Sequence, residues 1–208
     1  MQERQPQADL WQQLKTPVSI IAGFVLLLWV LEIVDQVILG GGLDSFGVRP
    51  RTISGLWGIV WAPFLHGGFQ HLLANTGPIL ILGSIVMLSR HLRDFFLITM
   101  IVTIIGGFGT WLIGPRFSVH LGASGLIFGY FGFLLLSAYF ERSCRSIVIA
   151  GIVLLLYSGI IWGVLPQGGG ISWQTHLFGF FGGGVAAYLL SQRQIQDQSI
   201  LRIREDDL

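Results

Sequence analysis

The stretch VHLGASGLIFGYFGF, from Val119 to Phe133, opens a run of apolar and glycine residues that is long enough to enter a lipid bilayer. Near the start of this run the hydroxyl of Ser124 lies between Ala123 and Gly125. A polar group inside a membrane helix is costly, and it is a functional hypothesis by default. A lone serine in such a helix more often bonds its own backbone. Its meaning therefore depends on the polar groups that accompany it in the other helices.

The composition is that of an integral membrane protein. Of the 208 residues, 52% are hydrophobic and only 11% are charged, whereas soluble domains carry about 25% charged residues. The length suits one compact domain. A net charge of +1 without any basic run argues against a nucleic-acid partner. The single cysteine, Cys144, excludes an intrachain disulfide and a metal site built from several cysteines.

The expected fold is an all-α membrane protein, a bundle of six transmembrane helices. A spanning helix needs about 20 mostly apolar residues, and the sequence contains six such segments. They cover approximately residues 18–39, 71–88, 95–113, 122–140, 147–165 and 173–190. We therefore expect a core over residues 18–190, between a polar segment at 1–17 and a charged tail at 191–208.

Positive charges predict the orientation of this bundle. With six spans, both tails lie on one side, together with the loops after the second and fourth spans. That side holds Arg4, Lys15, Arg90, Arg93, Arg142, Arg145, Arg193, Arg202 and Arg204. The opposite side holds only Arg49, Arg51 and Arg116. Because basic residues accumulate in cytoplasmic loops, both termini are expected in the cytoplasm. Residues 1–17 lack an apolar signal core, so we expect no cleaved targeting peptide.

The segment 40–70 differs from the other connections. It is long, rich in glycine and tryptophan, and too polar and too broken to span a membrane. Trp57 and Trp61 suit the membrane–water interface, where tryptophan is enriched. We expect a partly structured interfacial loop on the non-cytoplasmic side.

A first polar cluster lies in HGGFQHLLAN, which contains His66, His71 and Asn75. His71 and Asn75 are four residues apart, so a helix places them one turn apart on the same face. Hydrogen bonding between membrane helices is an equally good reason for such a pair.

A second polar group, His176, begins a stripe of small residues on the sixth expected span. Gly179 and Gly183 form a GxxxG pair, which lets another helix approach closely. The fourth span has a stripe of its own, Gly122, Gly125, Gly129 and Gly132. Packing the two stripes together would bring His176 towards Ser124. The alternative is a histidine that only completes the packing.

Together these residues are the parts of an acyl-transfer site. A serine nucleophile needs a general base within hydrogen-bond reach, and the oxyanion needs fixed donors. The sequence GASG is not the G-x-S-x-G nucleophile elbow, because the second glycine directly follows Ser124. His120, four residues before Ser124, is a rival base that we expect to lie in a loop.

The ordered set of motifs resembles the rhomboid family of intramembrane serine proteases. In chain order the matching motifs are H-x4-H-x3-N (His66, His71, Asn75), G-x-S-G (Gly122 to Gly125) and H-x2-G-x3-G (His176, Gly179, Gly183). They fall in the second, fourth and sixth spans, as in that family, and the likeness extends over residues 18–190. Each motif alone is weak, whereas the ordered set is specific.

The resemblance implies a catalytic role for each motif. Ser124 is the nucleophile, and His176 is its general base and later the acid for the leaving amine. The oxyanion hole is formed by His71, Asn75 and the backbone N–H of Ser124. No acidic third member is required in this family.

Three further residues support this site by resemblance. His66 orders the entry turn, Gly122 allows close backbone approach to the oxyanion, and Phe128 stacks on the base histidine. Phe128 stands where the family often carries tyrosine, so the stacking is kept and the hydroxyl is lost. Trp57-Gly58 stands where the family often has Trp-Arg, which puts the polar anchoring of the first loop (residues 40–70) in doubt.

The implied activity is that of a serine endopeptidase that cleaves transmembrane segments of single-pass membrane proteins. Its partners are those substrates and the lipid bilayer, it needs no metal or cofactor, and it resides in a bacterial inner membrane. A rhomboid-like protein that binds client helices without cutting them is the alternative. A haem or metal protein using His66, His71, His120 and His176 is a more distant one.

Overall fold

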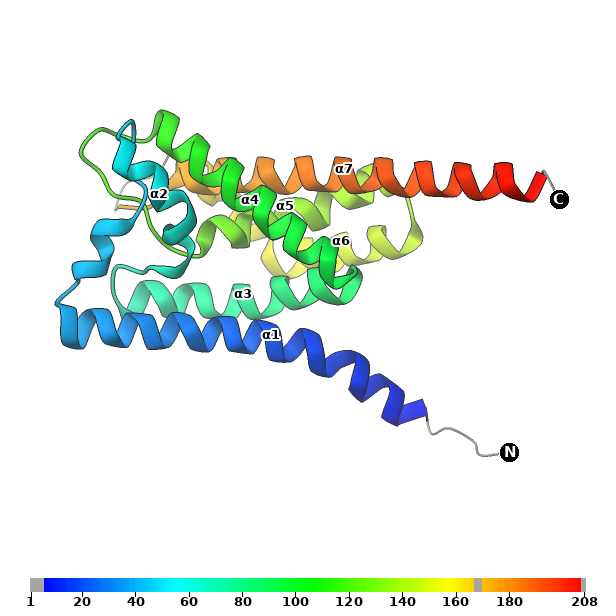
Figure 1. The fold of residues 1–208 in the computed structure, drawn as a ribbon, viewed down its shortest axis with the longest axis horizontal. Coiled ribbons are helices and arrows are strands. Elements are labelled where there is room, and N and C mark those ends of the chain that lie inside the picture. Colours follow the sequence, from blue (N-terminus) through cyan, green and yellow to red (C-terminus); the bar gives the residue numbers. More distant parts are fainter. Residues whose placement is uncertain (1–5, 167–169, 207–208) are drawn as a thin grey trace.

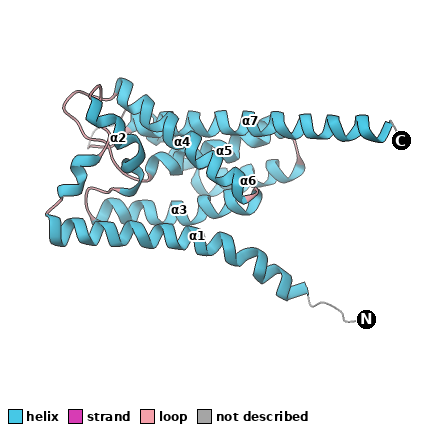
Figure 2. Cartoon of the chain, viewed as in Figure 1, coloured by secondary structure: helices cyan, strands magenta, loops and turns pink. Residues whose placement is uncertain are grey.

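The computed structural model describes residues 6–166 and 170–206, and the named elements of this part are all helical. The α-helices are α1 (Pro6–Val34), α2 (Ile53–Trp61), α3 (Phe69–Ser89), α4 (Leu92–Ile113), α5 (Ser124–Glu141), α6 (Cys144–Tyr157) and α7 (Trp173–Asp206). Shorter segments are the π-helical η1 (Asp35–Leu39) and the 3₁₀ segments η2 (Gly42–Phe46), η3 (Ala62–Phe64) and η4 (Ser158–Val164). Short loops connect these helices (Figure 2).

The helices form a bundle in which α5 is the central member. It packs against α7, α6, α4 and α3, while α1 lies along α3. Figure 1 shows that α1 begins and α7 ends at the same end of the molecule, and that α2 lies at the other end. The side chains of α5 are largely buried, and Phe131 and Phe133 are fully enclosed in the core.

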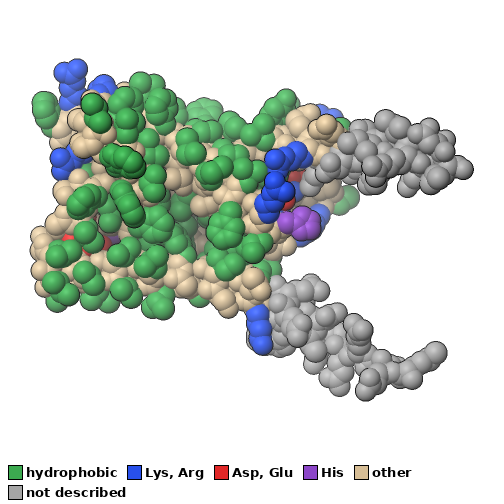
Figure 3. All heavy atoms as spheres, viewed as in Figure 1, with side chains coloured by type: hydrophobic (Ala, Val, Ile, Leu, Met, Phe, Trp, Pro, Cys, Tyr) green, Lys and Arg blue, Asp and Glu red, His purple; other side chains and the backbone are tan. Residues whose placement is uncertain are grey.

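Within the part of the chain that the structure describes, five helical segments are long and apolar enough to cross a membrane. They are Lys15–Leu39, Phe69–Ser89, Leu92–Ile113, Ser124–Glu141 and Cys144–Val164. Hydrophobic side chains cover the middle of the face shown in Figure 3, and outward-facing residues such as Leu155 are 83% exposed. A surface this apolar requires lipid around it. The protein is therefore an integral, multi-pass membrane protein.

Glycines allow α5 and α7 to pack with their backbones nearly touching. A Cβ atom added at Gly179 would collide with the carbonyl of Gly125, and one added at Gly183 would collide with the carbonyl of Gly129. This confirms the expected pairing of the two glycine stripes. It also brings the start of α7 to the start of α5.

The helix ends differ from the sequence-based expectation in three places. Helix α1 begins at Pro6, well before residue 18, and α7 continues to Asp206, past the expected end at residue 190. The expected fifth helix over 147–165 is divided, because α6 ends at Tyr157 and the chain continues in the 3₁₀ segment η4. Hydropathy reports how apolar a segment is, whereas helix length and helix type depend on backbone hydrogen bonds.

The segment between α1 and α3 is partly helical, as expected. The sequence lacks the Trp-Arg pair at this segment, and Arg51 and Trp111 anchor it instead. The Arg51 guanidinium donates hydrogen bonds to the carbonyls of Leu112 (2.9 Å) and Gly114 (2.8 Å) at the end of α4. The indole N–H of Trp111 donates to the carbonyl of Thr52 at 2.8 Å. The first loop is thereby fixed to α4.

Candidate active site

Ser124 and His176 meet at the contact between α5 and α7. Ser124 is the first residue of α5, and His176 lies in the first turn of α7. The Oγ atom of Ser124 is 2.9 Å from Nε2 of His176. The structure therefore brings together the two residues that the sequence predicted as nucleophile and base, at the distance of a hydrogen bond.

The other ring nitrogen of His176 contacts the backbone of η4. Its Nδ1 lies 2.9 Å from the carbonyl oxygen of Gly163. Because a carbonyl can only accept, Nδ1 must carry the proton and Nε2 of the neutral ring must be the acceptor. The Gly163 carbonyl therefore selects the tautomer in which His176 can accept the proton of Ser124.

The phenyl ring of Phe128 packs against one face of the His176 imidazole. The two rings are stacked, with centroids 4.1 Å apart and planes 7° apart. A Cβ atom at Gly163 would lie 2.5 Å from the tip of the Phe128 ring and 3.2 Å from His176 Nδ1. The phenyl ring and the glycine thus leave the imidazole little freedom to rotate.

A second group of side chains surrounds the backbone of Gly122, two residues before Ser124. Gly122 has φ +118°, a conformation that favours glycine. A Cβ atom there would lie 2.8 Å from Nε2 of His71 and 3.6 Å from Nδ2 of Asn75. His71 and Asn75, one turn apart on α3, therefore point at the same stretch of backbone.

These side chains present hydrogen-bond donors to that stretch. The N–H of Gly67 donates to Nδ1 of His71 at 3.4 Å, so in the neutral ring Nε2 of His71 carries the proton. The Nδ2 amide of Asn75 is buried and has no hydrogen-bond partner. The first N–H groups of a helix, here including that of Ser124, have no partner within the helix. Buried donors without partners are rare, and they favour a ligand oxygen at this position.

His66 bonds to the loop that carries Ser124. Its Nε2 accepts a hydrogen bond from the N–H of Ala123 at 3.3 Å, and its side chain is only 1% exposed. Burial, and secondarily the nearby His71, lowers the pKa of His66 to about 3. His66 is therefore neutral near pH 7, as an acceptor at Nε2 must be. The sequence assigned it to the entry turn, and the structure shows that it bonds the turn before α5 as well.

The ring nitrogens of His120 bond to residues other than Ser124. Its Nε2 lies 2.7 Å from the hydroxyl of Ser118, and its Nδ1 lies 2.6 Å from the hydroxyl of Ser172. Both ring nitrogens are engaged, so the structure gives no support to His120 as a rival base for Ser124.

Among the described residues, no group of three His, Cys, Asp or Glu side chains lies close enough together to hold a metal ion. The arrangement around Ser124 offers three kinds of chemical group. It contains a serine hydroxyl, an imidazole with a fixed tautomer, and converging N–H donors.

The sequence analysis missed one contributor to this site and one anchor of the first loop. The carbonyl of Gly163 is a backbone atom, and no residue pattern indicates where a carbonyl will point. Arg51 was counted only as one of the three positive charges on the side opposite the termini, whereas it anchors the first loop to the end of α4. Its spacing from the Leu112–Gly114 segment is determined by the fold and cannot be read from the sequence.

Comparison with known proteins points to one family. The Rhomboid domain matches residues 54–193. Rv1337, an uncharacterized protein of Mycobacterium tuberculosis, is 44% identical over 95% of this chain and 87% of its own length. Rhomboid protease GluP of Bacillus subtilis is 29% identical over 91% of this chain and 38% of its own length. RHOMBOID-like protein 4 of Arabidopsis thaliana is 30% identical over 72% of this chain and 37% of its own length. The chain belongs to the rhomboid family.

Proposed function

We propose that this protein is an intramembrane serine endopeptidase that cleaves single-pass membrane proteins with a Ser124–His176 dyad. One observation carries the proposal. The base histidine is hydrogen-bonded on both nitrogens, with Oγ of Ser124 on Nε2 and the Gly163 carbonyl on Nδ1. A histidine that only completed helix packing would not need this tautomer. The name of the Bacillus subtilis relative, a rhomboid protease, agrees with this activity.

In the first half of the reaction, Oγ of Ser124 attacks the carbonyl carbon of the scissile peptide bond. The hydroxyl proton moves to Nε2 of His176, which the Gly163 carbonyl has left free to accept it. The resulting imidazolium then donates this proton to the leaving amine, and the peptide bond breaks. The products are an acyl-enzyme on Ser124 and a peptide with a free amino group.

The tetrahedral intermediate places a negative charge beside Gly122. The donors available there are Nε2–H of His71, the amide of Asn75 and the N–H of Ser124. We assign them to the oxyanion hole. The loss of one such donor typically reduces the rate by about 10²–10³-fold.

Hydrolysis completes the cycle. His176 takes a proton from a water molecule, the resulting hydroxide attacks the acyl carbonyl, and Ser124 Oγ is released with the proton from the imidazolium. Ser124 and Gly125 are partly exposed, in agreement with a site that water can reach.

The same proposal includes the arrangement in the membrane. We propose that α7 forms a sixth span, with residues 18–190 as the protease core, residues 1–17 and 191–208 in the cytoplasm, and 40–70 at the opposite interface. The shared end of α1 and α7 supports this arrangement (Figure 1). The location is a bacterial inner membrane.

The test is a cleavage assay in detergent and in liposomes. The substrate is a labelled single-pass protein with small residues near the outer edge of its membrane helix. We expect the wild type to cleave it, with or without a chelator. Ser124→Ala and His176→Ala should be inactive, whereas Asn75→Ala should keep about 0.1–1% of the activity, because only one donor is lost.

Equal residual activity in Asn75→Ala and Ser124→Ala would refute the division of roles. If the wild type instead bound several substrates without cutting any of them, the chain would be a client-binding protein, and the proposed activity would be wrong.

A further inference from the structure

His120 lies at the junction of three segments that surround the proposed active site. Its backbone forms an isolated antiparallel bridge with Val48 of the first loop, with N···O distances of 2.9 and 2.8 Å. Two residues later, the N–H of Gly122 donates to the carbonyl of Ala62 at 2.9 Å. The backbone of residues 120–122, which lead into Ser124, is thereby fixed to the first loop.

The His120 side chain connects the same loop to α7. Its Nδ1 lies 2.6 Å from Oγ of Ser172, and Oγ of Ser172 lies 2.6 Å from Oγ1 of Thr175. The N–H of Thr175 also donates to Oγ of Ser172 at 3.4 Å, so Ser172 caps the start of α7. Thr175 directly precedes His176. The imidazole therefore reaches the turn that carries the proposed general base.

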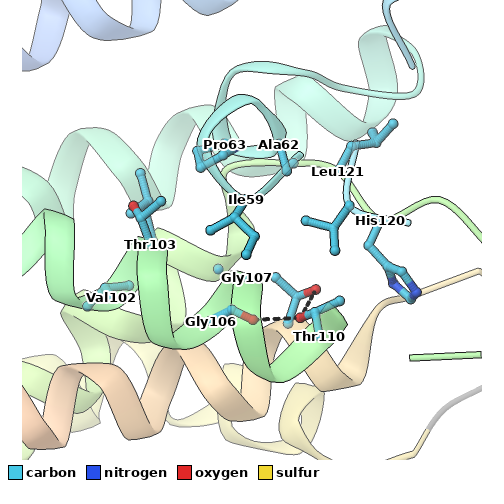
Figure 4. Close-up of a pocket in the computed structure, with 15 residues that line it drawn as sticks. Ile59, Ala62, Pro63, Val102, Thr103, Gly106, Gly107, Thr110, His120 and Leu121 are labelled. Carbon is cyan, nitrogen blue, oxygen red and sulfur yellow. Dashed lines mark hydrogen bonds between the residues drawn. The ribbon is translucent and has the colours of Figure 1, made fainter. Parts of the chain in front are cut away.

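This network of hydrogen-bonded side chains continues into the bundle. Oγ1 of Thr175 lies 2.9 Å from Oγ1 of Thr110, which donates to the carbonyl of Gly106 at 2.7 Å. Figure 4 shows Gly106 and Thr110, at the inner end of this network, beneath a small cavity, with His120 at the cavity's edge. Gly122 and Gly125, on either side of Ser124, line the same cavity of about 30 Å³.

At the outer end of this hydrogen-bond network, Ser118 determines which nitrogen of His120 carries a proton. Oγ of Ser118 donates to the carbonyl of Pro115 at 2.7 Å, so it must accept from Nε2–H of His120. Burial lowers the pKa of His120, which favours the neutral ring. Nδ1 of the neutral ring then accepts from Ser172, and the single hydroxyl proton of Thr175 is donated either to Ser172 or to Thr110. The neutral His120 ring thus donates from Nε2 to Ser118 in its own loop and accepts at Nδ1 from Ser172 at the start of α7.

We propose that His120 is a positioning residue for the dyad, because its imidazole ties the loop before Ser124 to the capped turn that carries His176. This inference rests on the proposed protease function. A dyad made of residues from two different helices depends on their relative position, and a misplacement of about 1 Å can cost about 10²-fold in rate. The His120 side chain bonds to Ser118 in the loop before Ser124 and to Ser172 at the start of α7.

The test compares His120→Leu with His120→Gln. Leucine has a similar size but no polar atom, whereas the glutamine amide offers one donor and one acceptor, as the neutral imidazole does. A fluorophosphonate probe measures the reactivity of Ser124 without a membrane substrate, and a cleavage assay gives kcat and KM. Both are run well below the melting temperature of each variant.

We expect His120→Leu to lower the fluorophosphonate reaction rate and kcat by about 10–100-fold, with KM nearly unchanged. His120→Gln should recover most of this loss. Thr110→Val, which removes the hydroxyl at the far end of the chain, should not add its full effect to that of His120→Leu, because both interrupt one network. Ser45→Ala, which removes an exposed hydroxyl bonded only to its own loop, is the matched control.

Two results would overturn the inference while the protease assignment stands. One is a His120→Leu variant with wild-type kcat and probe reactivity, and the other is a His120→Gln variant as impaired as His120→Leu. A wild-type protein that does not react with the probe, like Ser124→Ala, would instead refute the proposed function itself, and this inference with it.

Discussion

At the scale of single residues, Gly122 occupies a position that no other residue fits. Its φ of +118° is unfavourable for residues with a Cβ atom, and a Cβ atom there would lie 2.7 Å from Cε1 of His71. Any side chain would therefore strain the loop and fill the space in which we place the oxyanion.

We predict that Gly122→Ala reduces cleavage by at least about 10²-fold, because the added methyl group displaces His71 and removes at least one oxyanion donor. The fluorophosphonate and cleavage assays measure this loss. Gly77→Ala on α3 is the control, since a Cβ atom there meets nothing within 4 Å. Near-normal activity of Gly122→Ala would exclude an oxyanion hole at this position.

The side chains of the candidate site were predictable from the sequence, and its backbone groups were not. Ser124, His176, His71 and Asn75 are polar residues in apolar segments, so the cost of burying them marks them in the sequence. The Gly163 carbonyl carries no such mark, because every residue has a carbonyl.

At the scale of elements, the contact between α5 and α7 determines whether the dyad exists. Each of these helices contributes one member, and glycines set their separation. Gly183 has the backbone of Gly129 where its Cβ atom would be. A larger residue at position 183 must therefore push α7 away from α5.

We predict that Gly183→Ala lowers the stability by about 1–3 kcal/mol through overpacking, and that cleavage falls at temperatures at which the variant is still folded. The melting temperature in detergent and the cleavage rate at 25 °C measure the two effects. Gly151→Ala on α6, where a Cβ atom meets nothing within 4 Å, should change neither quantity. A Gly183→Ala variant with an unchanged melting temperature and a wild-type cleavage rate would show that the spacing between α5 and α7 tolerates change.

Sequence periodicity and hydropathy predicted the elements unequally. The helices α3, α4 and α5 begin and end within about three residues of the expected spans, because loops with arginine or glycine bound each apolar run. The change from α6 to η4 was not predicted, since an apolar segment looks the same whether it is α-helical or 3₁₀-helical. That change places the Gly163 carbonyl against His176.

At the scale of the whole molecule, α7 determines how many times the chain crosses the membrane. Among the described residues, five segments meet the criteria of length and apolarity, whereas α7 combines an apolar first half with a charged second half. We propose that its first half spans the membrane because it carries His176 and packs along the spanning helix α5.

The single cysteine offers a direct test of this topology. Cys144, the first residue of α6, is exposed and not in a disulfide. We predict that a membrane-impermeant maleimide labels it in inverted membrane vesicles and not in intact spheroplasts. In a Cys144→Ser background, Ser199→Cys should behave in the same way, because six spans place the C-terminal tail on the same side as Cys144. Arg116→Cys should react only from the opposite side.

The three labelling sites separate the possible arrangements. If residue 199 reacted from the same side as residue 116, α7 would not cross the membrane, and the six-span bundle would be wrong. If all three sites reacted from the sides opposite to those predicted, the number of spans would stand and the orientation would be reversed. The proposed active site would then open towards the cytoplasm. It lies at the same end of the molecule as Arg116, because Ser124 directly follows the loop that contains this residue.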